Sequence, residues 1–438
     1  MLRALRIGTF AIASTTAALA SGKPGSSPYE LVDQFADVLA RIENDYVEPA
    51  AREKLAQGAI QGMVDALDPH SAYMPPDDYD DFKADTSGQF AGIGVEVDLR
   101  NGQITVVAPI PGSPAERAGI RGGDRIVSVN GIAPDTLPLV EVVHRMRGKK
   151  GSTVRLIVRR RGNPSPLSFN VVRDDVKLPS IYVRQFDHSV AYLRITAFQE
   201  GTHAELLDKL GELASRSNYR GILLDLRQNP GGLVGEAIAV ADEFLNGGLL
   251  FYTRHQGKLV DRVETTAYGH FENIPLVTLV DEGTASAAEI LAGALKDRKR
   301  SAIVGARTFG KGTVQTIFDL SDGSGLRLTS MRYYTPAGLG IQASGVEPDE
   351  TIVESDADLD GSMREADLPN HLPSERLSNP VHSKSSELGE PAEKRPCPIT
   401  KPMESLLERI RRLPPSPKAS DGKILARGFQ LLVSRLQN

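Results

Sequence analysis

The sequence has very little cysteine, no tryptophan and no long apolar run in its interior. Cys397 is the one cysteine among 438 residues, so no disulfide can form within the chain. It lies in a proline-rich region, which argues against a catalytic thiol and favours a solvated one. Beyond the N-terminus no segment is long and apolar enough to cross a bilayer. Disulfide scaffolds, cysteine-based zinc sites and multi-span membrane proteins are therefore excluded.

An excess of charge of one sign is also missing. The net charge is −5, which gives no general affinity for nucleic acid or for an anionic membrane. We therefore expect no nucleic-acid partner. The hydrophobic fraction of 40% and the charged fraction of 24% are ordinary for a soluble protein. The length is sufficient for two or three domains, each with its own core.

The first twenty residues have the composition of an export signal. Arg3 and Arg6 precede the apolar stretch Ile7–Ala20, and Ala18-Leu19-Ala20 fits the small-residue rule for cleavage after Ala20. An uncleaved anchor is the alternative, but this stretch falls short of the roughly 20 residues that a membrane span needs. We predict a signal peptide at residues 1–20 and a periplasmic location, and leave membrane association open.

Four regions are expected to follow, giving an α+β multidomain fold. Residues 28–82 contain two amphipathic helices, which would cap another domain or pair with a second copy. Residues 88–173 carry short β-rich runs with glycine turns, and in residues 176–353 strands and helices alternate. Residues 354–438 form a linker and a short helical tail, because residues 355–403 hold seven prolines and no aromatic residue.

A serine follows one of the predicted buried strands. Leu276–Val280 leads into a turn in which small residues surround Ser286, at the start of a predicted helix. Small neighbours would let a substrate backbone approach, and the amides of a helix N-terminus would lie beside a tetrahedral oxyanion. The alternative is a serine that merely caps the helix, and this segment alone does not decide between the two.

A catalytic serine needs a base, and the usual ones are missing. None of the eight histidines stands in an evident triad context, and the chain contains no G-x-S-x-G elbow. Lys311, between two glycines, can act as a base if burial lowers its pKa towards neutrality. Gln315 follows four residues later in a predicted strand, so it lies on the same face and could hold the amine in line.

Two glycine patterns have competing interpretations. Gly305-x-x-x-x-Gly310-Lys311 is nearly a phosphate-binding loop, but Gly312 stands where that loop needs Ser or Thr, and a strand rather than a helix is predicted next.

Asn229-Pro230-Gly231-Gly232, after another buried strand, is a turn signal. Its glycine amides also suit the second donor of an oxyanion hole.

Three segments together resemble a known family. Asp225–Gly232, Gly283–Ala287 and Phe309–Gln315 match, in order and spacing, the motifs D-L-R-x-N-P-G-G, G-[ST]-A-S-A and F-G-K-G-T-V-Q of carboxyl-terminal processing peptidases, also called tail-specific proteases. The resemblance covers about residues 28–352. Two departures are Thr284 and Ala288, where the family has serines, and Leu339-Gly340, where it carries Arg or Lys.

The resemblance implies a serine peptidase without a metal or organic cofactor. It assigns Ser286 as nucleophile, Lys311 as general base and Gln315 as the partner that positions the base. The backbone amides of Ala287 and of Gly231 or Gly232 would form the oxyanion hole.

The β-rich region resembles a PDZ domain, with Ala91–Val95 similar to its carboxylate-binding loop. The implied peptide-binding residues are Gly92, Ile93, Gly94 and Val95, and on the helix Leu139, Val142, Val143 and Met146. Core packing is the alternative for these side chains. Arg147, at the end of the helix, is a candidate for coupling the PDZ domain to the peptidase domain, or else a solvated arginine.

The resulting hypothesis is an endopeptidase that cleaves near the C-terminal tails of exported proteins through a Ser/Lys acyl-enzyme. Its expected partners are proteins with unstructured C-terminal tails. Self-association through the N-terminal helices or the C-terminal tail, an adaptor protein, and a broad or single substrate are left open. The alternative is a non-catalytic PDZ adaptor with a degenerate peptidase domain, against which the retention of Ser286, Lys311 and Gln315 argues.

Overall fold

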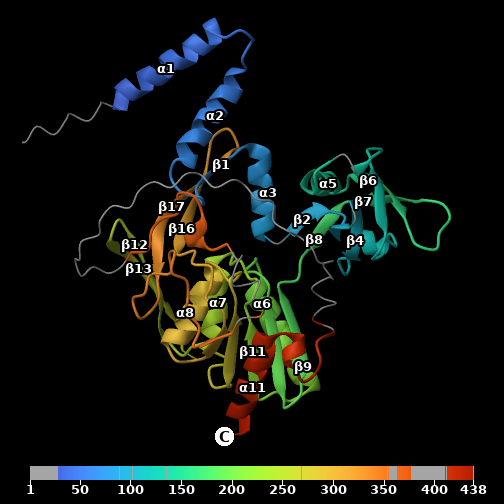
Figure 1. Ribbon diagram of the computed structural model, residues 1–438, viewed down its shortest axis with the longest axis vertical. Coiled ribbons are helices and arrows are strands. Elements are labelled where there is room, and N and C mark those ends of the chain that lie inside the picture. The colour runs from blue at the N-terminus through green and yellow to red at the C-terminus, as the bar shows by residue number, and fades with distance from the viewer. Residues whose placement is uncertain are drawn as a thin grey trace, which may run out of the picture. The chain divides into compact units, whose positions relative to one another are not determined.

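The computed structural model describes residues 28–87, 89–100, 102–134, 137–267, 269–352, 354, 363–375, 410 and 412–437 (Figure 1). The predicted signal peptide, Cys397 and most of the predicted linker lie outside these residues. The chain divides into two compact units after Gly62. Among the described helices, none combines the length and the apolar character that a membrane span requires.

The N-terminal unit consists of helices, as the apolar spacing predicts. Helix α1 (Pro28–Asp45) is followed by α2 (Arg52–Asp65), which runs across the division between the units. Most of the apolar side chains that suggested an amphipathic α1 are exposed, with Val32 at 63% and Phe35 at 48%, whereas Leu39 and Ile42 are partly buried. Within the part of the chain that the structure describes, most of this face of α1 is uncovered.

The second unit begins with a short connection to residues 176–353, which the resemblance assigns as the peptidase domain and which we call the catalytic domain. Strand β1 (Ala72–Met74) pairs antiparallel with β17 (Gly325–Tyr334), and helix α3 (Pro76–Ser87) follows it. Helix α3 was not predicted, because Asp77, Asp78, Asp80 and Asp81 interrupt its apolar periodicity.

The β-rich region folds as predicted. Its five-stranded antiparallel sheet has the order β3-β4-β5-β6-β7, and a small second sheet pairs β2 with β8. The strands are β2 (Gln89–Gly92), β3 (Val95–Arg100), β4 (Gln103–Pro109), β5 (Arg125–Val129), β6 (Thr153–Arg159), β7 (Leu167–Val172) and β8 (Asp174–Lys177). Helices α4 (Pro114–Arg117) and α5 (Leu139–Met146) complete it, and α5 buries Val142 and Met146 in the core.

The catalytic domain is built on a six-stranded sheet. Its order is β18-β15-β14-β11-β10-β9, and all neighbours are parallel except β9 and β10. The strands are β9 (Ile181–Phe186), β10 (Val190–Ile195), β11 (Gly221–Asp225), β14 (Leu276–Val280), β15 (Ala302–Gly305) and β18 (Glu350–Thr351). Helices α6 (Thr202–Arg216), α7 (Val234–Phe244) and α8 (Ala287–Asp297) connect them. A second, antiparallel sheet joins β1, β17, β12 (Gly248–His255) and β13 (Lys258–Thr265), with β16 (Thr313–Asp319) beside β17.

Both faces of the six-stranded sheet are covered. Side chains alternate along a strand, so Ile222 and Leu224 pack on the side of α6, α7 and α8, whereas Leu223 packs with Phe429 and Leu432 of α11 (Lys423–Gln437). The predicted C-terminal helix is therefore a structural layer of the catalytic domain (Figure 1). Its apolar face alone could not reveal which surface it covers.

The structure departs from expectation within the predicted linker. Residues 363–375, which we call the strap, include the 3₁₀-helix η2 (Glu365–Asp367) and pack on the catalytic domain. Glu365 has no exposed surface. Composition predicted no structure here because the strap is held by polar contacts with distant residues rather than by an apolar face of its own.

Candidate active site

The carboxyl ends of three adjacent parallel strands supply the three predicted motifs. Strand β11 leads into Asn229-Pro230-Gly231-Gly232, β14 leads into the turn before Ser286, and β15 leads into the loop that carries Lys311. Carboxyl ends of parallel strands meet at one edge of a sheet, where α/β proteins place their functional groups. The topology thus brings together groups that are up to 80 residues apart in the sequence.

Ser286 stands immediately before α8 in an unusual backbone conformation. Its φ is 55° and its ψ is −120°, a region that costs a residue with a side chain on the order of 1–3 kcal/mol. Such a conformation persists only where the surroundings enforce it. Here the neighbouring amides and the helix start hold the serine at a sharp strand-to-helix turn.

Glu289 is the group that holds this turn. Its side chain is fully buried, and its Oε2 accepts hydrogen bonds from the backbone N–H of Ser286 at 2.8 Å and of Lys311 at 2.9 Å. Its Oε1 accepts from Gly310 N at 2.8 Å and from Thr308 Oγ1 at 2.5 Å. One carboxylate oxygen therefore ties the backbone of the candidate nucleophile to that of the candidate base.

Burial and hydrogen bonding act on Glu289 in opposite directions. Burial raises the pKa of Glu289 to about 7, although its four donors all favour the ionised form. Three of these donors are backbone N–H groups, which could not accept a hydrogen bond from the O–H of a protonated Glu289 carboxyl group. We therefore assign the ionised carboxylate as the form that fits this geometry.

The glycine turn packs directly on the serine. A Cβ atom at Gly231 would lie 2.8 Å from Ser286 Cβ and 2.9 Å from Ala287 N, so glycine is required there. The Gly231 amide donates to Asn229 Oδ1 at 2.8 Å, whereas Gly232 is exposed and lines the cavity described below. Of the two predicted glycine donors, Gly232 is thus better placed to offer its N–H to a substrate. Ala287 N is at the first helical position, where no acceptor exists within the helix.

Two polar residues, Asp225 at the end of β11 and Thr284 in the turn after β14, are structural. Asp225 is buried and accepts hydrogen bonds from Tyr192, Arg194 and Arg227. Burial acts to raise its pKa, but the guanidinium groups of Arg227 and Arg194 hold the pKa of Asp225 well below its usual range. At the noted departure, Thr284 is buried and donates to Leu226 O at 2.9 Å, so it joins the two turns.

Lys311 is half-buried, and both positively and negatively charged side chains act on it. Burial lowers its pKa from the ordinary value, and the nearby Arg327 guanidinium lowers it further. The carboxylates of Glu365, Asp68 and Glu289 act in the opposite direction. The segment that follows is strand β16 rather than a helix, which excludes the phosphate-binding loop.

A single cavity of about 500 Å³ joins these groups. Ser286, Lys311, Gln315, Gly231 and Gly232 all line it, together with Phe82 of α3 and Arg327 of β17. The structure therefore brings the predicted catalytic residues to one solvent-accessible site. Gln315, however, donates to Thr313 Oγ1 at 2.9 Å and to Thr329 Oγ1 at 3.4 Å, and no contact between it and Lys311 is seen.

The predicted peptide-binding residues divide into two groups. Ile93, Gly94, Val95, Val143 and Met146 line a cavity of about 230 Å³, which Arg147, the candidate for coupling the two domains, also lines. Val142 is instead fully buried in the core, Leu139 packs against that core, and Gly92 pairs with Asp174 in the small sheet. Gly94 has a φ of 74°, and a Cβ there would lie 2.4 Å from Ser113 Cβ, so this position also requires glycine.

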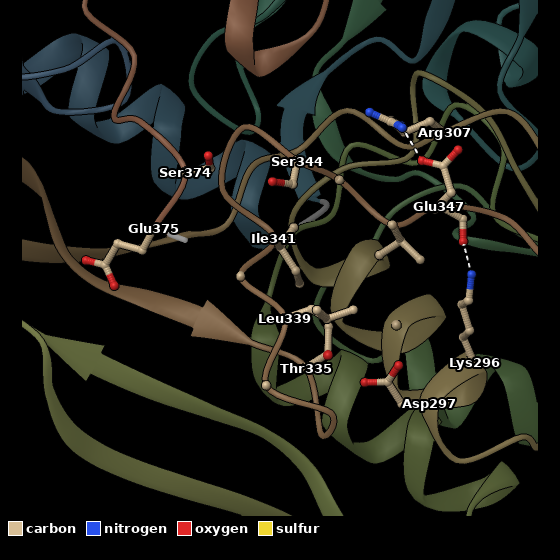
Figure 2. A pocket seen from close by; sticks show the side chains of 15 residues that line it. Lys296, Asp297, Arg307, Thr335, Leu339, Ile341, Ser344, Glu347, Ser374 and Glu375 are labelled. Carbon is tan, nitrogen blue, oxygen red and sulfur yellow. Dashed lines mark hydrogen bonds and ion pairs between the residues drawn. The ribbon is translucent and has the colours of Figure 1, made fainter. Parts of the chain in front are cut away.

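A second cavity of about 550 Å³ lies beside the Lys311 loop and α8 (Figure 2). Leu339 and Gly340, at the other departure from the family motif, line it with Ser374 and Glu375 of the strap. Its charged side chains are engaged with the protein: Arg307 pairs with Glu347, and Lys296 donates to Glu347 O. The described residues contain no group of three or more His, Cys, Asp or Glu arranged to bind a metal ion.

Sequence reasoning missed the residues that support the site. Glu289 had a recognisable signal, because Ser286-Ala-Ala-Glu289 is the S-x-x-E pattern of a capping box. His70, Gln342 and Glu365 had none, since their contacts join segments up to 295 residues apart. They could not be assigned before the fold was known.

Comparisons with known proteins agree with this architecture. Residues 189–352 match the model of peptidase family S41, residues 105–160 a PDZ domain, and residues 11–78 the activating protease CtpB N-terminal domain. A carboxy-terminal-processing protease of Bartonella bacilliformis is 37% identical over 80% of this chain and 82% of its own length. This chain belongs to the carboxy-terminal processing protease family, within peptidase family S41.

Other relatives of this family are similarly close. The carboxy-terminal processing protease CtpB of Bacillus subtilis is 35% identical over 78% of this chain and 72% of its own. Among solved structures, a photosystem II D1 C-terminal processing protease is 32% identical and covers 77% of this chain and 92% of its own, with a TM-score of 0.45. The predicted family, the PDZ domain and the α+β multidomain fold are confirmed.

Proposed function

We propose that this family member is a serine endopeptidase that uses Ser286 as nucleophile and Lys311 as general base on proteins with unstructured C-terminal tails. The observation that carries the proposal is the shared cavity, which both Ser286 and Lys311 line, while their backbone amides share one oxygen of Glu289. The adaptor alternative has no such support, because it gives no reason for a half-buried lysine with a lowered pKa beside the serine.

The proposed reaction is acyl-enzyme hydrolysis. Neutral Lys311 accepts the Ser286 proton as the hydroxyl attacks a peptide carbonyl, and the resulting oxyanion is held by the amides of Ala287 and Gly232. The protonated lysine then gives its proton to the leaving amine. The same lysine activates the water that releases the acyl group. Gln315 would act by fixing the loop through Thr313 and Thr329.

A tailed model protein tests this function. We expect the purified enzyme to cleave within or beside an unstructured C-terminal tail fused to a stable domain, and Ser286→Ala to leave the tail intact. Mass spectrometry of the products would locate the cut. Intact tails with a folded wild-type enzyme, or cleavage by Ser286→Ala, would contradict the proposal.

The PDZ cavity is proposed to select the substrate by its terminal carboxylate. Because backbone amides near Gly94 would hold that charge, amidation of the tail should slow cleavage of a folded substrate roughly tenfold, the effect of losing a hydrogen bond to a charged group. A short peptide that diffuses directly into the catalytic cavity serves as the control and should be less affected. Equal kcat/KM for free and amidated folded substrates would remove this role.

Export into a periplasm, with exported proteins as substrates, is part of the same proposal. It rests on the basic and apolar pattern of residues 1–20. The exposed apolar face of α1 supports pairing with a second copy, and an adaptor protein stays open.

A further inference from the structure

The strap reaches the loop that carries Lys311 through its backbone. Glu365 N donates to Phe309 O at 3.1 Å, and Arg364 Nη2 donates to Thr308 O at 3.2 Å. Arg364 also donates to Ser344 O at 3.1 Å. The strap lies beyond residues 189–352, which match the peptidase family model, yet it contacts the residues immediately before Lys311.

The side chain of Glu365 joins three distant segments at this point. It is fully buried, its Oε2 lies 2.7 Å from His70 Nε2, and its Oε1 accepts a hydrogen bond from Gln342 Nε2 at 2.8 Å. Gln342 in turn accepts from Gly312 N at 3.0 Å, and Gly312 directly follows Lys311. Each oxygen of Glu365 thus has a partner that connects it to a different part of the site.

The His70 branch leads to a second residue that lines the cavity. His70 O accepts from Arg327 Nε at 2.8 Å, and Arg327 lines the cavity. Asp68 accepts hydrogen bonds from the backbone N–H groups of His70 and Ser71 and from Thr329 Oγ1. The Thr329 hydroxyl in turn accepts a hydrogen bond from Gln315 Nε2. Glu365 therefore lies at the junction of two hydrogen-bonded paths that flank Lys311.

We infer that Glu365 is a positioning residue of the peptidase: the strap holds the Lys311 loop through Gln342 and holds the Asp68–Ser71 segment through His70, so that the catalytic domain is incomplete without residues 363–375. This inference rests on the proposed function of Lys311 as general base. A buried carboxylate with both oxygens engaged is costly to place unless its contacts are needed.

The position of Glu365 also gives it an electrostatic effect. Around Lys311, the charged and titratable groups are Arg327 on β17, Glu289 on α8, Asp68 and His70 in the segment before β1, and Glu365 on the strap. The carboxylate of Glu365 favours the ammonium form of Lys311, so it raises the pKa of the base and opposes burial and Arg327. Neutralising Glu365 should therefore lower that pKa.

Two substitutions separate geometry from charge. Glu365→Gln keeps an oxygen for Gln342 and can donate to His70 Nε2, so it removes mainly the charge. Its pH–rate profile should move to lower pH by on the order of half a unit, because the base becomes neutral earlier. Glu365→Ala removes the side-chain partner of His70 Nε2 and one of the two acceptors of Gln342 Nε2, the other being Leu372 O, and should lower kcat about tenfold with little change in KM.

Asp367→Asn is the matched control, since Asp367 is exposed in the same turn and an asparagine can still accept from Arg364 N. It should leave the profile and the rate unchanged. NMR of ¹³C-labelled lysine side chains reports the titration of Lys311 directly, with Lys311→Arg for assignment, and requires no turnover. A lower Lys311 pKa in Glu365→Gln supports the inference even if no substrate has been found.

The outcomes distinguish the two proposals. If the wild-type enzyme cleaves and both Glu365 variants retain its rate, profile and Lys311 titration, the inference is wrong and the proposed function stands. An equal effect of Asp367→Asn would also overturn the inference, because the effect would then be general to the strap's charge. A wild-type enzyme that never cleaves, with Lys311 responding to Glu365→Gln, would instead overturn the proposed function.

Discussion

Replacing Lys311 with alanine is expected to slow peptide hydrolysis by on the order of a thousandfold or more, as Ser286→Ala does. The double variant should be no slower than either single variant, because a nucleophile and its base act as one unit. Steady-state or single-turnover rates of the full chain on a short fluorogenic peptide measure this effect, because such a peptide does not depend on capture by the PDZ domain. Losses that multiply in the double variant would show that another residue is the base.

The pH dependence of the same reaction identifies the base. Lys311 accepts a proton only when neutral, so activity should rise with pH through its pKa, which burial and Arg327 place below the ordinary lysine value of about 10.4. A histidine base would give a limb near pH 6.5 instead. His70 contacts Glu365, whose carboxylate acts on the pKa of Lys311, so His70→Gln is the control. If the wild-type enzyme showed a limb near pH 6.5 and His70→Gln abolished it, His70 rather than Lys311 would be the general base.

The catalytic groups could be predicted because their signals are local. Ser286 stands at a strand–helix junction among small residues, Lys311 between two glycines, and Gly231-Gly232 in a turn after a strand. Each pattern needs a few consecutive residues, and parallel strand order then brings the three together. Periodicity likewise predicted α11, since a helix announces its own apolar face.

The supporting structure could not be predicted because it depends on partners far away in the chain. The strap looks like a linker in composition, and Glu365 gains its meaning only from His70 and Gln342. Val142 illustrates the converse error: its helical spacing fits a peptide-binding pocket, but its side chain points into the core. Spacing predicts which residues share a face of a helix, and the tertiary packing decides how much of that face is covered.

Glu289 offers the other large expected effect. Removing its carboxylate by Glu289→Ala takes the acceptor from four donors: the buried Thr308 hydroxyl and Gly310 N–H, and the partly buried N–H groups of Ser286 and Lys311. The strained conformation of Ser286, with its φ of 55°, would then lose the hydrogen bond that its backbone N–H donates to Glu289. We expect kcat/KM to fall about a hundredfold or more and the free energy of unfolding to fall by about 3 kcal/mol.

Glu212→Ala is the matched control for Glu289→Ala, because it makes the same substitution at an exposed glutamate of α6 and should change neither quantity. Glu289→Gln refines the test. It keeps the volume and one acceptor oxygen, but its NH₂ group faces either the amides of Ser286 and Lys311 or the amide of Gly310 and the Thr308 hydroxyl, so in both orientations at least one N–H donor loses its acceptor and activity should be restored only in part. Urea unfolding measures the loss of stability. The rates are compared under conditions in which each variant is folded, so that the two losses are separated. Wild-type kcat/KM in folded Glu289→Ala would show that the shared oxygen does not align Ser286 with Lys311, and that the two loops hold their positions by packing alone.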